Sequence, residues 1–387
     1  MAAAADWTNL HQDLLTRIFV LLSCITDRVR FSALCKHWRS VALQSPSPLP
    51  WLLMPSTAVT SCYRIFGGFS DPRPSLADHP RGARFCGSFQ GGWFVVALEQ
   101  IRGHALLNLR SGERVRLPDR VRLRDYFSMQ DVDDIHFKDY TRKCPVFIRA
   151  ATMSAAPPAG PGAGAGACVV AALTTGQTNI AFWRPGMDCW STTKTELRGD
   201  AQDLTFHDGW FYTVTPRDEL FRYKVSNRRG GAIKVRGQEI SFPESWQAPL
   251  ASGEIVSRYL LPSASGEDLL MVKRYVHPAK GTWRFQVFTL LQKGSGLACR
   301  RFYRMWGQVL FVGRGCSKAF DTGNRQTGCV YFLDDVYRGP MSVLQQDQYR
   351  CTDTGSFCCF TKSSDNINRC LPQEPASDSS PWIWYLQ

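Results

Sequence analysis

The chain has 387 residues, of which 44% are hydrophobic, and it carries a net charge of +13. That length and composition favour one small module followed by one large domain. No apolar run approaches the roughly 18 residues of a membrane-spanning helix, and charged residues flank the first apolar run in a way untypical of a signal peptide. These features exclude a membrane-spanning protein and predict an intracellular one, cytoplasmic, nuclear or both.

The first 45 residues form a short module with a dense apolar pattern at helical spacing. Leu14, Leu15, Ile18 and Phe19 predict a broad apolar stripe on one helix, and Asp13 lies at the positive end of the helix dipole. So short a stretch cannot build an independent core. Its apolar excess therefore indicates either a partner that completes the core or a helical cap packed on the rest of the chain.

A second helix of the module is predicted to begin at Asp27, which is a good N-cap residue. Lys36, His37 and Arg39 interrupt its apolar side. We therefore expect this helix to bend or restart at that point.

The module resembles the F-box in the order and spacing of its residues. The matching positions are Leu10, Asp13, Leu14, Leu15, Ile18, Leu21, Asp27, Arg30, Phe31, Leu34, Cys35, Trp38, Arg39, Val41 and Ala42. The chain departs from the family at His11, where Pro is frequent. The resemblance implies a small all-α unit of three helices that docks on the Skp-type adaptor of cullin-RING ubiquitin ligases. It assigns the adaptor contact to Leu10, Leu14, Leu15, Ile18, Leu34 and Trp38.

Residues 46–62 are rich in Pro, Ser and Thr and predict a stiff, extended linker. From residue 63 to residue 387, short apolar runs alternate with Gly, Asp, Asn and Pro turns. Clear runs cover residues 93–98, 105–109, 169–173, 180–183, 210–214, 220–223, 269–272, 285–288, 309–312 and 330–333. Many short strands separated by turns predict a large all-β domain.

A weak internal repeat favours a β-propeller for this domain. Residues 90–96 and 207–213 each lead from a Gly turn into an aromatic strand. Repeats of about 40 to 50 residues are typical of propeller blades, and about 320 residues would hold six or seven of them. A pair of β-sandwiches is the alternative that the pattern leaves open.

Two further segments bear on this architecture. The low-complexity run 154–167, built from Ala, Gly and Pro, predicts a flexible loop inserted between strands. Residues 382–385 are too aromatic for a free tail. We expect them to form a terminal strand that pairs with an early strand and closes the ring.

The order of motifs in the domain resembles the plant family of KIB-type β-propellers, which commonly follow an F-box. The motifs lie at residues 86–93, 107–118, 206–212, 266–272, 310–313 and 330–335. The resemblance covers most of residues 63–387. It implies a substrate-recognition subunit of an SCF-type E3 ubiquitin ligase that binds a target protein of unknown identity.

A basic stretch stands out within the domain. Its arginines are Arg114, Arg116, Arg120, Arg122 and Arg124, the last three at a spacing of two. A strand here would present three guanidinium groups on one face. The stretch is either an anion-binding patch for an acidic partner, phosphate or nucleic acid, or a solvated strand face protected by charge. The second interpretation is favoured, because no aromatic residues interleave with the arginines as base-stacking positions.

We find no motif for catalysis, a cofactor or a metal. The 14 cysteines have no paired metal-ligand spacing and are expected to be reduced, buried thiols. The acidic residues Asp131, Asp133 and Asp134 lack the Gly and Glu of a calcium loop.

We therefore expect a non-catalytic adaptor, with no membrane or nucleic-acid partner. A propeller enzyme such as a glycan hydrolase would need convergent carboxylates at the blade centre, and the sequence shows no such set. The sequence leaves open a basic propeller that binds anions or nucleic acid, and an F-box protein that acts outside a ligase.

Overall fold

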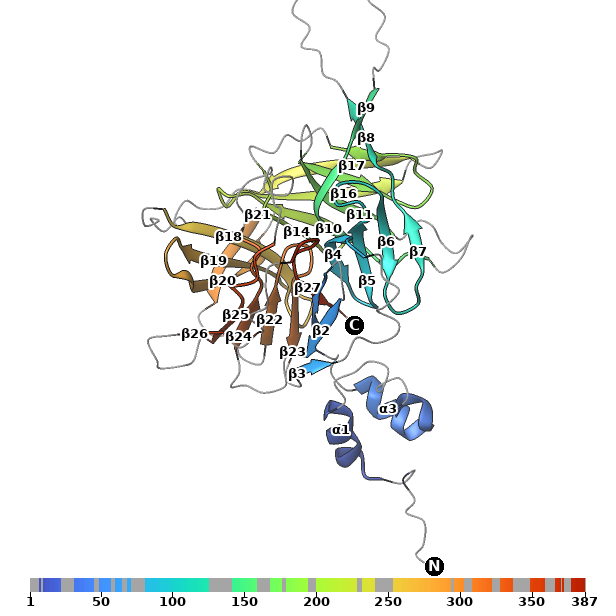
Figure 1. Ribbon diagram of the computed structural model, residues 1–387, viewed down its shortest axis with the longest axis vertical. Coiled ribbons are helices and arrows are strands. Elements are labelled where there is room, and N and C mark those ends of the chain that lie inside the picture. Colours follow the sequence, from blue (N-terminus) through green and yellow to red (C-terminus); the bar gives the residue numbers. More distant parts are fainter. Residues whose placement is uncertain are drawn as a thin grey trace, which may run out of the picture.

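The structure is a computed structural model in which a small helical region precedes a large all-β region (Figure 1). The residues described are 7, 10–21, 31–44, 49–56, 60–64, 68–70, 81–124, 141–158, 168–175, 179–193, 200–227, 232–240, 253–293, 296–302, 308–321, 328–336, 349–358, 366–369, 371 and 377–386. In this part of the chain no helix is both long enough and apolar enough to cross a membrane.

The helical region contains α1 (Gln12–Leu21), helical residues 31–34 and α3 (Lys36–Gln44). The three helices confirm the all-α prediction for the module. Asp13 lies in the first turn of α1, as predicted from the helix dipole. The chain breaks at Cys35 and restarts as α3 at Lys36, which confirms the predicted interruption. The predicted N-cap Asp27 lies outside the described residues.

Within the described residues the strands form six sheets, which we name blades one to six. Blade one contains β27 (Ile383–Tyr385), β1 (Trp51–Met54), β2 (Ser61–Arg64) and β3 (Gly68–Ser70); blade two contains β4 (Arg84–Phe89), β5 (Trp93–Ala97), β6 (His104–Asn108) and β7 (Arg114–Arg116). Blade three contains β10 (Phe147–Met153), β11 (Val170–Thr175), β12 (Ile180–Trp183) and β13 (Trp190–Thr192), extended by β8 (Arg120–Arg124) and β9 (Thr141–Pro145).

The last three blades follow in chain order. Blade four contains β14 (Asp203–His207), β15 (Trp210–Val214), β16 (Leu220–Asn227) and β17 (Ile233–Ile240). Blade five contains β18 (Ile255–Pro262), β19 (Leu269–His277), β20 (Gly281–Lys293) and β21 (Gly296–Phe302). Blade six contains β23 (Lys318–Asp321), β22 (Gln308–Val312), β24 (Cys329–Phe332), β25 (Gly355–Cys358) and β26 (Ile367–Asn368).

Shared cores arrange the six blades in a ring. Separate apolar clusters join blades two and three, three and four, four and five, and five and six. One further cluster joins blades six, one and two. Within β22, Val309 and Phe311 pack toward blade one, whereas Leu310 and Val312 pack toward blade five. Both faces of such a strand are buried, which explains its continuous apolar run. The prediction of a propeller is confirmed, with six blades, and the alternative of a sandwich pair is wrong.

The two ends of the all-β region meet in blade one. β27 pairs with β1 in antiparallel register, with Trp51 opposite Tyr385 and Leu53 opposite Ile383. This pairing confirms the predicted terminal strand. It also corrects the linker expected over residues 46–62, because residues 51–54 form β1 and lie inside the propeller. The apolar side chains of that strand outweigh the prolines on either side of it.

The low-complexity loop predicted over residues 154–167 lies between β10 and β11. Residues 154–158 of this run are described and form no strand. Residues 159–167 lie outside the described part of the chain, as do Asp131, Asp133 and Asp134.

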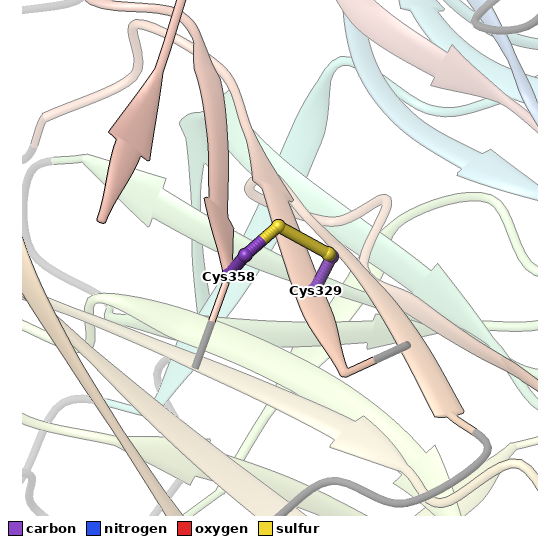
Figure 2. Close-up of a disulfide and its surroundings, with 2 residues drawn as sticks. All are labelled: Cys329 and Cys358. Carbon is purple, nitrogen blue, oxygen red and sulfur yellow. A yellow bond between two sulfur atoms is a disulfide. The ribbon is translucent and has the colours of Figure 1, made fainter. Parts of the chain in front are cut away.

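One pair of cysteines departs from the prediction of reduced thiols. Cys329 and Cys358 form a disulfide between neighbouring strands of blade six (Figure 2). The two residues are directly opposite in the antiparallel pairing of β24 and β25, with Cα atoms 4.5 Å apart, so their sulfur atoms meet. Their separation of 29 residues along the chain gives no hint of the pairing. Most other described cysteines are free and buried.

Candidate functional site

The helical module has a small core of its own. Leu15, Phe19, Phe31 and Val41 are buried together. The rings of Phe19 and Phe31 meet edge to face with centroids 5.0 Å apart, and Trp38 packs on Phe31 at 4.3 Å. These contacts bury one side of α1 and one side of α3. The opposite sides of both helices remain exposed.

Large apolar side chains are exposed on the same module. Their exposed fractions are 63% for Trp7, 48% for Leu14, 65% for Leu34 and 81% for Leu43. Among the described residues, most of the exposed large apolar side chains therefore belong to the helical module. Exposed apolar side chains of this size are candidates for contact with a partner.

The six residues expected to contact the adaptor separate into three groups. Leu14 and Leu34 are exposed and available for contact. Leu10, Ile18 and Trp38 are half-buried against the module's core. The structure corrects the prediction that Leu15 contacts the adaptor. Leu15 is fully buried in the core, so it holds the helices together and presents no surface to a partner.

The sequence reasoning missed Trp7 and Leu43. A signal for Leu43 was present, since it lies two positions after the core residue Val41 and therefore on the opposite side of α3. Trp7 precedes α1, and its backbone oxygen accepts a hydrogen bond of 3.1 Å from the indole of Trp38. That bond fixes the entry segment against α3.

His11 immediately precedes α1 and stands in place of the proline that is frequent in F-boxes. Its ring Nδ1 accepts a hydrogen bond of 3.3 Å from the N–H of Asp13. Its carbonyl oxygen accepts the N–H groups of Leu14 and Leu15. The histidine therefore caps the helix with its side chain, the task that N-cap residues perform.

The arginine-rich stretch spans two blades. Arg114 and Arg116 lie on β7, the outer strand of blade two, and both are exposed. β8 confirms the predicted alternation, because Val121 is buried in the core while Arg120 and Arg122 face outward. Arg124 ends β8, and its side chain lies outside what the structure describes. The tertiary structure thus brings the two halves of the stretch to the junction between blades two and three.

A surface cavity of about 460 Å³ lies at this junction. Its lining residues are Arg116, Leu117, Pro118, Asp119, Arg120, Lys143, Met187 and Asp188. Lys143 is directly opposite Arg122 in the pairing of β8 and β9, and Asp188 lies between the two cations, 2.7 Å from Lys143 and 3.7 Å from Arg122. The hydrogen bond from Lys143 lowers the pKa of Asp188 to about 2. The cavity is therefore basic and contains fixed carboxylates.

Asp119 is the other carboxylate of the cavity. Its Oδ1 accepts a hydrogen bond of 3.2 Å from the backbone N–H of His104 and lies 2.9 Å from the His104 Nδ1. Burial lowers the pKa of His104 to about 4, despite the opposing effect of Asp119. The imidazole is therefore neutral at pH 7, so its contact with Asp119 is a hydrogen bond and not an ion pair.

A turn at residues 313–317 fills the centre of the ring, and we call it the central turn. The N–H of Ser88 donates to the carbonyl oxygen of Gly315 at 2.9 Å, and the N–H of Gly315 donates to Asp203 at 3.1 Å. The preceding amide, on Arg314, donates to Asp335 at 2.8 Å. The turn of blade six therefore contacts blades two and four directly.

Asp203 and Asp335 are carboxylates that the sequence reasoning did not single out as a pair. Burial raises the pKa of Asp203 to about 7, against the hydrogen bonds from the amides of Leu260 and Gly315. Their backbone partners assign both residues to holding the central turn. Among the described residues, no three His, Cys, Asp or Glu side chains cluster as metal ligands.

Comparison with known proteins gives two family matches. A family model described as the KIB1-4 beta-propeller matches residues 68–360, and the F-box domain model matches residues 7–48. No curated protein matches the chain. These two matches cover the propeller and the helical module described above.

Solved structures resemble the chain only distantly. The N-terminal domain of Nup159 is 10% identical over 84% of this chain and 75% of that one, with a TM-score of 0.35. A complex of S. cerevisiae Dbp5 with Nup159 and Gle1 is 10% identical over 71% and 72%, with a TM-score of 0.32. A eukaryotic initiation factor is 11% identical over 86% and 75%, with a TM-score of 0.27. The fold assignment rests on the strand pairings and the family match instead.

Proposed function

Since the chain belongs to the KIB1-4 beta-propeller family and carries an F-box domain ahead of its propeller, we propose that it is the substrate-recognition subunit of an SCF-type, cullin-RING E3 ubiquitin ligase. F-box domains typically bind Skp-type adaptors. In this proposal the F-box binds that adaptor and, through it, cullin. The propeller binds the target protein for ubiquitination.

The exposed apolar surface of the F-box carries the proposal. Leu14, Leu34, Leu43 and Trp7 lie in water in the isolated chain, although apolar surface gains about 25 cal/mol per Å² when it is covered. A partner that packs on these side chains would remove that cost. The module's own core is complete without them, so they are free to serve an interface.

F-box and propeller domains are typical of non-catalytic adaptor proteins. We therefore assign ubiquitin transfer to other subunits of the ligase and binding alone to this chain. The hydrogen bonds of Asp203 and Asp335 to the central turn support this division, because they give both carboxylates a structural role. In this proposal the protein acts inside the cell, in the cytoplasm, the nucleus or both.

The test is co-purification of the full chain with a Skp-type adaptor and a cullin. In Leu14→Ala/Leu34→Ala both exposed leucines are removed, and we expect adaptor recovery to fall at least about tenfold, because central apolar contacts dominate interface energy. Ile255→Ala is the matched control, since it removes an exposed apolar side chain from blade five. Leu15 is left intact, because its loss would unfold the module.

Circular dichroism and thermal unfolding confirm that each variant keeps its propeller. Adaptor recovery that is unchanged in the double variant would contradict the proposed interface. Adaptor recovery without cullin would instead indicate an F-box protein that acts outside a ligase.

A further inference from the structure

We propose that the cavity between β7 and the β8–β9 hairpin binds an anionic side chain, phosphorylated or carboxylate, on a segment of the target protein. The proposal rests on the proposed function for the identity of the partner as a ligase target. The binding chemistry itself depends only on the cavity.

Among the described residues that line the cavity, cationic side chains outnumber carboxylates. Asp188 is shared between Lys143 and Arg122. Among the described residues, no carboxylate lies within 4 Å of the charged groups of Arg114, Arg116 or Arg120. Two of these, Arg116 and Arg120, line the cavity directly. A guanidinium group is suited to bind carboxylate and phosphate through two parallel hydrogen bonds.

The cavity also has the size and walls of a side-chain pocket. A volume of about 460 Å³ lies in the range of small ligand sites and accommodates one or two side chains. Leu117, Pro118 and Met187 provide apolar walls beside the cations. An anionic residue followed by an apolar one would satisfy both kinds of wall.

The walls are held rigidly. The indole of Trp190 donates to the carbonyl of Pro118 at 2.7 Å, and the N–H of Leu117 donates to the carbonyl of His104 at 2.9 Å. The N–H of Val146 donates to the carbonyl of Asp119 at 3.0 Å. These bonds tie the segment between β7 and β8 to both flanking blades. A site fixed before binding loses little entropy when a ligand enters.

The same lining favours a protein segment over a nucleic acid. Asp119 and Asp188 lie in the wall, where they repel a continuous phosphate backbone. None of the described residues that line the cavity is aromatic, so they offer no platform for stacking bases. A single anionic side chain can approach the arginines while the carboxylates exclude a longer run of negative charge.

The position of the cavity suits a ligase subunit. The β8–β9 hairpin and the F-box helices lie at opposite ends of the molecule in Figure 1. A target bound at the hairpin would therefore leave the adaptor surface uncovered.

The experiment uses the full chain with its adaptor. It is applied to an immobilised library of randomised 12-residue peptides whose central residue is fixed as phosphoserine, Glu or Ser. We expect more of the protein to be retained on the phosphoserine library, the Glu library or both than on the Ser library, and the choice between them identifies the anion. Arg116→Glu/Arg120→Glu should reduce that retention at least about tenfold, because it replaces two attractive charges by two repulsive ones. Raised salt should weaken it as well.

Arg217→Glu/Arg236→Glu is the matched control. It makes the same charge change at exposed residues of blade four. We expect the library to retain this variant as well as it retains the unaltered chain. The inference would be overturned if the Ser library retained as much protein as the anionic libraries, or if the Arg116→Glu/Arg120→Glu variant were retained as well as the unaltered chain. Binding of single-stranded RNA, rather than peptide, that depends on Arg116 and Arg120 would also overturn it. Adaptor recovery is measured on the same samples, so that loss of the adaptor with intact peptide binding contradicts the proposed function alone.

Discussion

At the scale of single residues, adjacent side chains have opposite roles. Leu14 and Leu15 are neighbours on α1, yet one is half-exposed and the other is fully buried. Asp203 and Asp208 lie in the same hairpin of blade four, yet the first is fully buried at the centre of the ring and the second is exposed. The environment of each side chain, more than its type, decides what it contributes.

Asp203 gives a pH-dependent contribution to stability. Burial raises its pKa from 3.8 to about 7, so between these values the folded state holds a proton that the unfolded chain releases. The contribution of Asp203 to the free energy of unfolding is therefore fully present below about pH 4 and falls as the pH rises to about 7, by an amount on the order of a few kcal/mol.

Asp203→Asn removes this titration. The unaltered protein loses the Asp203 contribution as the pH rises, whereas the variant does not. We therefore expect the free energy of unfolding of the variant, relative to that of the unaltered protein, to be higher at pH 8 than at pH 5. Urea unfolding at both pH values measures this difference. Asp208→Asn is the control, because it alters an exposed residue of the same hairpin. A difference between Asp203→Asn and the unaltered protein that is the same at both pH values would contradict the assignment.

At the scale of elements, the central turn joins blade six to blades two and four. Its backbone is bound to Ser88, Asp203 and Asp335. Gly315 has a φ of +63°, a conformation that favours glycine. β4 can approach the turn because Gly87 has no side chain, so the turn and the inner strands form one packed unit.

Gly87→Ala tests this packing. A Cβ atom at Gly87 would press on the carbonyl oxygen of Ala151 and lie 3.2 Å from the carbonyl oxygen of Gly315. Neither backbone atom can move aside easily, so we expect a loss of about 1 to 3 kcal/mol in the free energy of unfolding.

The matched control is Gly112→Ala. Gly112 has a φ of +74° but nothing within 4 Å of the added Cβ, so it is expected to cost only about 1 kcal/mol of backbone strain. Thermal and urea unfolding measure both variants. Equal effects of the two substitutions would show that the approach at Gly87 is not tight.

At the scale of the whole molecule, the ring is closed by the ends of the all-β region. Trp384 of β27 is fully buried, and its indole donates to the carbonyl of Val312 in blade six at 3.0 Å. Buried ion pairs also cross between blades: Lys273 is 2.8 Å from Asp218, and Arg274 is 2.8 Å from Asp353. The blades therefore depend on one another.

Trp384→Ala should destabilise the entire propeller. Truncating a buried Trp costs about 3 to 5 kcal/mol in the free energy of unfolding. Because blade one shares its core with blades two and six, we expect a single unfolding transition at a lower denaturant concentration than in the unaltered protein. Trp283→Ala, which removes a tryptophan that is 44% exposed, is the control and should have a much smaller effect. Separate unfolding of blade one would contradict a cooperative ring.

The sequence by itself determined the elements of this protein. Alternating apolar runs placed the strands, the aromatic segment 382–385 proved to be the closing strand, and helical spacing placed α1 and α3. These features are predictable because hydrophobic periodicity and turn residues act over a few positions. The F-box and the family of the propeller were likewise evident from the order of short motifs.

Only the tertiary structure decided the number of blades, the burial of Leu15, the disulfide of blade six, the central turn and the basic cavity. Each depends on residues that are distant along the chain. Asp203 meets Gly315 across 112 positions, and Lys143 meets Asp188 across 45. Such contacts follow from how the sheets pack around the ring, which the local pattern of any one strand does not specify.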